Sequence, residues 1–372
     1  MERKEVGFES GGERCAAWLY PSPPAATSPA IVMAHGLTGT RRDRLGAFAK
    51  RFAQAGIAAL VFDHRGFGDS EGEPDLFEPR RQLEDWAAAI AHVRSLDGVD
   101  PARVATFGSS MGGGNALAAA AADPEVAAAV SQVPFLTMRQ AHRSPLRVQA
   151  RMIAAAIRGR HLPALGQPGD AAFINAPGGK AGWQHVVAIG EDSRWRDRAS
   201  SRWLLASPFT FNYVRHARRL HCPWLVCVGE ADRVAAPGIA IRAARRAPLG
   251  ELRTYPGVDH FDIYDGPEHE AVVADEIEFL QRHLQVSPDS SWCSAYRATL
   301  LWWPLPIRFH FVLVLMVGVL WRTLPVSGGL PEPRLLARRL PRRPSASGGG
   351  RGSPRRLRSS RTIPSTARSA IA

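Results

Sequence analysis

Ser110 is the residue of this sequence best placed to act as a nucleophile. It stands in Gly108-Ser109-Ser110-Met111-Gly112, a G-x-S-x-G pattern between the strand-like VATF and an alanine-rich helical run. Glycines on both sides of such a serine remove the Cβ atoms that would clash in a sharp strand-to-helix turn, so the hydroxyl can stand exposed. The pattern predicts a serine nucleophile, and a glycine-rich turn without catalysis is the alternative.

A serine hydroxyl is a poor nucleophile without a base, and His260 is the candidate base because it follows the strand-like ELRTY. In this type of site the chain order is serine, then acid, then histidine. Asp232 follows the strand-like WLVCV and is the predicted acid, which would hold the imidazole in the correct tautomer. Glu230 and Asp259 are close rivals for the acid, and a loop histidine of no consequence is the alternative for His260.

A tetrahedral intermediate also needs two backbone N–H groups directed at its negative charge. Met111 follows the nucleophile and is one predicted donor. The other is expected in His35-Gly36-Leu37-Thr38-Gly39, the loop after the apolar run AIVMA, with the Leu37 N–H as our choice. We interpret His35 as a structural hydrogen-bonding residue.

The elements that must position these residues alternate between strands and helices. Short apolar runs predict strands at 14–20, 30–34, 57–62, 103–107, 126–130, 224–228 and 251–255. Helical spacing or composition predicts helices at 42–55, 77–96, 111–122, 238–246 and 267–284. The alternation predicts an α/β fold whose mostly parallel sheet is covered by helices on both faces. The candidate residues would then meet at the carboxyl edge of the sheet.

Two segments interrupt the alternation and set the expected domain boundaries. Residues 1–136 and 209–285 form the two parts of the core, and residues 137–208, with helical patches and Pro/Gly-rich loops, form a cap insertion. We interpret the arginines in 139–160 as a solvated helix face. Residues 286–372 are expected to be a tail outside the core.

The tail also accounts for most of the net charge of +13. It contains 14 arginines against one aspartate and one glutamate, so residues 1–285 have a net charge of only +1. Because the core is nearly neutral, nucleic-acid binding by a basic face of the fold is not expected.

Within the tail, residues 300–324 are apolar but interrupted by prolines and Arg308. The uninterrupted apolar run, 311–321, is 11 residues long, whereas a spanning helix needs about 20. A spanning helix is therefore disfavoured, and peripheral contact of the tail with a membrane is the weaker alternative that the sequence leaves open. From Pro331 the Arg/Pro/Ser/Gly composition predicts disorder.

Partners and compartment follow from what the sequence lacks. The four cysteines show no metal pattern or CxxC pair, and Cys222 and Cys227 are expected to be small core residues. Met1–Ser10 has no apolar stretch typical of a signal peptide, which predicts a cytoplasmic protein.

In the glycine-rich loop 63–72, Asp63, Asp69 and Ser70, together with Arg65, are expected to fix a tight turn.

The chain resembles the α/β-hydrolase superfamily in its blocks MAHGLTGTRRDRLGAFAKRFAQAGIAALVFDHRGFGDSEG, FGSSMGGGNAL, VCVGEADRVAAP and YPGVDHFDIY. It is most similar to the group of dienelactone hydrolases, acetyl xylan esterases, and prolyl aminopeptidase-type and X-Pro dipeptidyl-peptidase-type serine peptidases. Dienelactone hydrolases proper use a cysteine where this chain has Ser110. The resemblance covers about residues 1–285 and implies the same triad and oxyanion residues.

The expected function is therefore hydrolysis of a carboxylic ester in a small-molecule acyl substrate, through an acyl-enzyme. A serine peptidase or a thioesterase of the same fold is the enzymatic alternative. The non-enzymatic alternative is a catalytically inactive binding protein. No metal or organic cofactor is expected, and the sequence does not indicate an oligomeric state.

Overall fold

A single twisted sheet forms the centre of the fold in the computed structural model, which describes residues 2–22 and 27–284. Within these residues its strand order is β1-β2-β4-β3-β5-β6-β9-β10. The strands are β1 (Lys4–Ser10), β2 (Glu13–Tyr20), β3 (Ser28–Ala34), β4 (Ala58–Phe62), β5 (Val99–Ser109), β6 (Ala128–Gln132), β9 (Trp224–Gly229) and β10 (Gly250–Tyr255). β2 pairs antiparallel with β1 and β4, and the remaining pairs are parallel.

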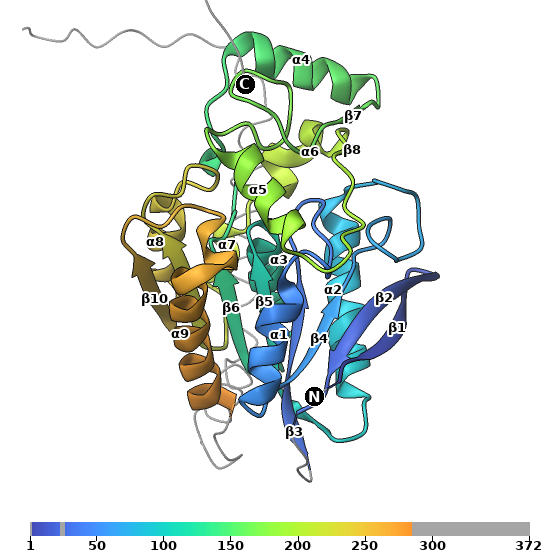
Figure 1. Cartoon of the computed structure of the whole chain (residues 1–372), viewed down its shortest axis with the longest axis vertical. Helices are drawn as coiled ribbons and strands as arrows, with labels where there is room; N and C mark the ends of the chain where they lie inside the picture. Colours follow the sequence, from blue (N-terminus) through green and yellow to red (C-terminus); the bar gives the residue numbers. More distant parts are fainter. Residues whose placement is uncertain (1, 23–26, 285–372) are drawn as a thin grey trace, which may run out of the picture. The chain divides into compact units, whose positions relative to one another are not determined.

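Helices cover both faces of this sheet, as the alternation predicted (Figure 1). The helices of the core are α1 (Leu45–Gln54), α2 (Pro79–Arg94), α3 (Met111–Ala122), α8 (Gly238–Ala244) and α9 (Gly266–Leu284). α1 packs against α9 on one face, and α2 packs against α3 on the other. The central strands β3 and β4 are buried along their whole length, which is why they are continuous apolar runs rather than alternating ones.

The segment between β6 and β9 contains the helices that lie over the carboxyl edge of the sheet (Figure 1). It holds η1 (Met138–Gln140), α4 (Leu146–Ile157), β7 (His161–Leu162), α5 (Gly179–Ala188), β8 (Ala199–Ser200), α6 (Trp203–Thr210) and α7 (Val214–Ala217). The expected insertion 137–208 falls within this segment. Besides its helices, the segment contains β7 and β8, which form a two-residue antiparallel pair.

One missed strand and one shifted helix start have local reasons. The first ten residues include β1, an edge strand that was not predicted because its outer residues are polar and exposed, although Phe8 and Ser10 are buried. The helix predicted over 42–55 begins only at Leu45, since Arg44 has a left-handed φ of 72° that cannot belong to a right-handed helix.

The predictions for residues 286–372 lie outside the described residues. No helix within the described part of the chain is long and apolar enough to cross a membrane.

Candidate active site

The turn between β5 and α3 places Ser110 at the carboxyl edge of the sheet. Ser110 has φ 57° and ψ −122°, a strained conformation for a residue with a side chain. Its N–H donates to the Gln132 carbonyl of the neighbouring strand at 2.9 Å. A Cβ on Gly108 would lie 1.9 Å from the Gly112 oxygen, and one on Gly112 would lie 2.6 Å from the Ala34 oxygen. The close packing of this turn therefore requires both glycines of the motif.

The structure brings Ser110, His260 and Asp232 into one chain of contacts. His260 Nε2 is 3.1 Å from Ser110 Oγ, and His260 Nδ1 is 2.7 Å from Asp232 Oδ2. The other carboxylate oxygen of Asp232 accepts the N–H groups of Val234 and Ala235 at 2.8 and 2.7 Å. The side chains of His260 and Asp232 are almost fully buried. Asp232 is thus fixed with one oxygen directed at the imidazole, as a triad requires.

The two rival acids do not contact the His260 ring. Asp259 forms an ion pair with Arg233, and its Oδ1 accepts the backbone N–H groups of His260 and Arg233. Burial alone would raise the pKa of Asp259, but these donors and the Arg233 charge lower it. Glu230 is exposed to solvent. Among the three candidates, only Asp232 lies within hydrogen-bond distance of the imidazole.

The two predicted oxyanion donors lie next to each other. A Cβ on Gly36 would lie 2.5 Å from the Met111 nitrogen, so the backbone of this loop directly adjoins the start of α3. Within the described residues, neither the Leu37 N–H nor the Met111 N–H has a hydrogen-bond acceptor. Leu37 has a φ of 45°, which is strained for a leucine. Two unpaired N–H groups beside Ser110 are what an oxyanion hole needs.

His35 has the structural position that the sequence indicated. Its Nε2 contacts the carbonyl oxygen of Asp43, and its ring stacks on Tyr264 and meets the edge of Trp183. Burial lowers the pKa of His35 to about 4, because its effect is larger than that of the hydrogen bond to the Asp43 carbonyl, which raises the pKa. The imidazole is therefore neutral at physiological pH and holds the loop that contains Leu37.

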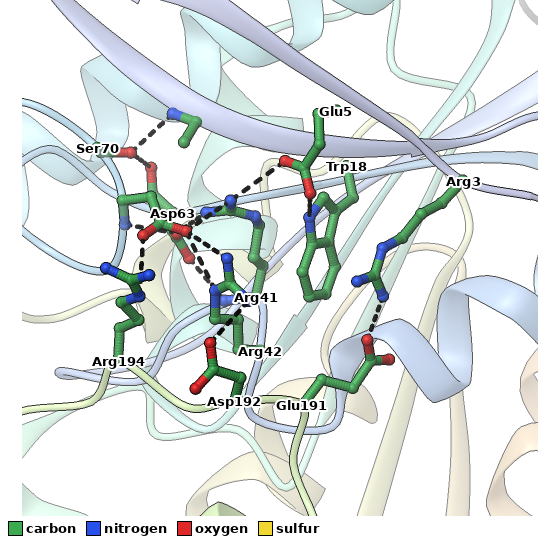
Figure 2. Close-up of polar contacts among 12 residues, drawn as sticks. Arg3, Glu5, Trp18, Arg41, Arg42, Asp63, Ser70, Glu191, Asp192 and Arg194 are labelled. Atoms are coloured by element: carbon green, nitrogen blue, oxygen red, sulfur yellow. Dashed lines mark hydrogen bonds and ion pairs between the residues drawn. The ribbon is translucent and has the colours of Figure 1, made fainter.

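The glycine-rich loop 63–72 supports the same region. Ser70 Oγ donates to the Asp63 carbonyl at 2.7 Å, and the Asp69 N–H donates to the Asp63 carboxylate at 3.1 Å, as expected of a local turn. The expectation for Arg65 was wrong, because its guanidinium pairs with Glu84 and Asp85 of α2 instead of a carboxylate of the loop. Ion pairs also join Asp63 and Asp69 of this loop to Arg41 and Arg42, which belong to the segment 35–44 around Leu37, the oxyanion loop (Figure 2).

Sequence reasoning missed a strap of the cap, residues 191–200, that is bound to the oxyanion loop. Trp195 Nε1 donates to Thr38 Oγ1 at 2.8 Å, and Ser193 Oγ donates to the Asp43 carboxylate. Two further ion pairs join the strap to this region, Asp192 with Arg42 and Arg194 with Asp69 (Figure 2). These residues are far apart in the sequence and belong to no motif, so periodicity could not have found them.

Sequence reasoning also missed the contact that joins the histidine loop to the nucleophile turn. Tyr264 Oη and Ser109 Oγ are 2.5 Å apart in the core. Burial raises the pKa of Tyr264, so its hydroxyl remains neutral and can donate or accept. The only signal in the sequence was a tyrosine four residues after His260.

An apolar pocket opens beside Ser110. Leu37 and Met111 line it at the sheet edge, and the cap supplies most of the rest, including Met138, Met152 and Trp203. Its polar lining side chains are those of Ser110, His142 and Asn175, and it has no carboxylate. Such a lining suits the hydrocarbon part of an acyl group.

Comparison with known proteins assigns the family. A model of the serine aminopeptidase family S33 matches residues 25–265. The chain belongs to this hydrolase family. Its other similarities agree with an enzyme of this type. It is 40% identical to the quorum-quenching protein AidA of Acinetobacter baumannii over 295 residues, which are 76% of this chain and 95% of AidA. It is 32% identical over 161 residues to the thiohydrolase aneE of Aspergillus aculeatus, covering 41% of this chain and 50% of aneE.

Solved structures of this superfamily show the same fold. The α/β-hydrolase GrgF from Penicillium has a TM-score of 0.67 at 22% identity, and the match covers 77% of this chain and 100% of GrgF. A monoglyceride lipase from Saccharomyces cerevisiae has a TM-score of 0.60 at 15% identity, covering 76% of this chain and 95% of the lipase. The expected α/β-hydrolase fold is confirmed, and the S33 protein described here is a hydrolase.

Proposed function

We propose that the protein is a serine hydrolase that cleaves a carboxylic ester of a small acyl substrate. The observation that supports this most is the contact chain from Ser110 Oγ through His260 to Asp232. The unpaired N–H groups of Leu37 and Met111 beside Ser110 are the second element of such a site. Family membership sets the reaction class, and the triad and the ester bond are our proposal.

The proposed reaction has two halves. Ser110 Oγ attacks the acyl carbonyl while its proton passes to His260 Nε2, and the resulting oxyanion accepts the N–H groups of Leu37 and Met111. Collapse of this intermediate breaks the bond to the alkoxide, which takes the proton from His260 and leaves the acyl group on Ser110. A water molecule, deprotonated by His260, then attacks the acyl-enzyme and releases the carboxylic acid.

The pocket argues for an acyl substrate over a peptide N-terminus, despite the family's name. An aminopeptidase must bind a positively charged amine, and a desolvated cation needs a carboxylate partner. The pocket beside Ser110 has no aspartate or glutamate in its lining, whereas methionine and aromatic side chains are frequent. An alkyl chain is the better fit for this surface.

A thioester is the second candidate bond. The partial similarity to a thiohydrolase favours it, because a thioester needs the same nucleophile and oxyanion donors. The similarity to a quorum-quenching protein adds lactones, which are cyclic esters, to the substrates worth testing.

Purified protein should be tested against p-nitrophenyl esters of increasing chain length, a lactone, an acyl thioester and an aminoacyl p-nitroanilide. We expect turnover of the esters with a KM that falls as the chain lengthens, because the pocket is apolar. A fluorophosphonate should label the wild type and leave Ser110→Ala unlabelled. Labelling of Ser110→Ala, or a preference for the aminoacyl anilide, would contradict the proposal.

A further inference from the structure

Helix α4 of the cap has an apolar face that covers nothing in the described structure. Val148 and Ala156 are buried, and Met152 lines the pocket beside Ser110, so these side chains form the inner face of the helix. Leu146, Ile153 and Ile157 have exposed fractions of 81%, 50% and 66%. Their spacings of seven and four residues put all three on a single face. Exposing three large aliphatic side chains together is unfavourable in water.

This concentration of exposed aliphatic side chains distinguishes α4 from the rest of the described chain. The other exposed large hydrophobic residues there are Leu205, on the neighbouring helix α6, and Leu249, at the amino edge of the sheet. Single exposed residues of that kind are normal on a protein surface, whereas a row along one helix usually marks an interaction site. α4 also lies at the outer end of the cap, away from the sheet (Figure 1).

The charges beside this face have one sign. Residues 139–160 contain six arginines and neither aspartate nor glutamate. Arg147, Arg151 and Arg158 are exposed next to the apolar row, and none of them forms an ion pair within the described residues. The sequence alone indicated a solvated helix face, but the exposed aliphatic row makes α4 an amphipathic basic helix of the interfacial kind.

We propose that α4 binds the surface of an anionic lipid bilayer. Leu146, Ile153 and Ile157 enter the boundary between headgroups and acyl chains, and the flanking arginines contact the lipid phosphates. The charges favour a lipid surface over a second copy of this chain, because two such faces would bring arginines against arginines. Since Met152 of the same helix lines the pocket, binding would hold the pocket close to the bilayer. The binding itself does not depend on the proposed ester chemistry.

A fluorescent probe on α4 tests this directly in the full chain. Ile153→Cys in a Cys293→Ser background can be labelled selectively with the environment-sensitive dye NBD, since Cys15, Cys222 and Cys227 are buried. We expect a blue shift of the dye with vesicles of phosphatidylcholine mixed with phosphatidylglycerol, and none with phosphatidylcholine alone. The matched control is Leu249→Cys, an equally exposed position at the opposite edge of the sheet, which should not respond. Because the dye reports only its own surroundings, binding of vesicles by residues 286–372 cannot mimic the result.

A charge variant gives the second measurement. Arg147→Gln, Arg151→Gln and Arg158→Gln together should weaken the vesicle-dependent shift at residue 153 roughly tenfold to a hundredfold in lipid concentration. The matched control replaces three exposed arginines outside the cap, Arg218→Gln, Arg245→Gln and Arg246→Gln. It should change the vesicle-dependent shift at residue 153 little. An unchanged thermal unfolding midpoint verifies that each variant is folded.

Three outcomes would overturn the proposal. The dye at residue 153 could stay in water on anionic vesicles, or the dye at residue 249 could shift equally. A blue shift that grows with protein concentration in the absence of lipid would assign the face to a second copy or another protein partner instead.

Discussion

The sequence offers three carboxylates, Asp232, Glu230 and Asp259, as partners of His260, and their surroundings in the fold differ. Asp232 points one oxygen at the imidazole and uses the other to accept two backbone N–H groups. Asp259, the residue next to His260, faces Arg233 instead. Proximity in sequence therefore does not identify the acid, because a loop can turn neighbouring side chains in opposite directions.

Asp232→Asn should lower kcat by about 10³-fold to 10⁴-fold with little change in thermal stability, because an amide favours the wrong imidazole tautomer. Asp259→Asn is the matched control. It keeps an oxygen that can accept the same backbone N–H groups and loses only an exposed ion pair, so kcat should remain near wild type. Steady-state kinetics and thermal unfolding decide this. If Asp232→Asn were active and Glu230→Gln dead, Glu230 would be the acid.

Glu276 is a buried carboxyl in α9 that the proposed reaction does not use. Its Oε1 accepts from the Gln132 side chain at 3.3 Å, and its Oε2 has no hydrogen-bond partner in the described structure. Burial raises the pKa of Glu276 well above its ordinary value, and the Asp275 charge adds to this. The folded protein therefore holds a proton here that the unfolded chain releases as the pH rises above about 4.3.

Above that pH, the folded state binds more protons than the unfolded state at this site, so the free energy of unfolding falls as the pH rises. Glu276→Gln removes this contribution to the pH dependence of the free energy of unfolding. The stability of the variant relative to wild type should rise with pH above about 5, by roughly 1 kcal/mol for each pH unit over which Glu276 stays protonated in the folded state. Urea unfolding at several pH values measures the difference, with the exposed Glu278→Gln as control. A stability difference independent of pH would mean that Glu276 is ionised in the fold.

At the scale of elements, the cap strap 191–200 is bonded to the strained oxyanion loop at two points. Leu37 has a left-handed φ, which costs free energy that surrounding contacts must offset. The Trp195 indole bonds the hydroxyl of Thr38, the next residue, and Ser193 bonds Asp43 at the other end of the loop. Arg196 and Arg198 anchor the strap itself on the buried Asp75 at 2.5 and 2.6 Å.

Trp195→Phe should lower kcat about fivefold to tenfold with little change in KM, because loss of one hydrogen bond loosens an oxyanion donor. Affinity for a boronic acid, which forms a tetrahedral adduct on Ser110, should fall in parallel. Trp183→Phe is the matched control, since the Trp183 indole N–H has no partner within the described residues and its ring also contacts the loop. Equal losses in both variants would argue that the strap does not position Leu37.

At the scale of the whole molecule, the catalytic candidates and every strand of the described residues precede the tail, residues 286–372. The last described helix, α9, ends at Leu284, and His260 precedes it. Residues 1–285 have a net charge of only +1, so nearly all of the basic charge follows them.

A chain that ends after Val286 should therefore have the same ester kinetics and thermal midpoint as the full chain, with a sharply lower isoelectric point. Isoelectric focusing, unfolding and turnover measure the three properties. Aggregation of the shortened protein, or loss of turnover, would show that residues 300–324 pack on the hydrolase fold.

The sequence by itself determined seven of the eight strands of the described sheet, the nucleophile turn and the chain order of the candidate triad. These follow from local chemistry: buried strands need continuous apolar runs, and the turn at Ser110 needs glycine at 108 and 112. Strand β1 was missed because an edge strand with one exposed side lacks that apolar signal.

Only the tertiary structure showed that Asp232, and not Glu230 or Asp259, contacts the His260 imidazole, because the direction of a loop side chain depends on what packs around the loop. It alone also showed the strap on Thr38, the Tyr264–Ser109 contact and the aliphatic row on α4. The two contacts join residues that are distant in the sequence, and the row is exposed because no other described segment packs on it. Helical periodicity shows which residues share a face, and the fold determines whether that face meets the core or the solvent.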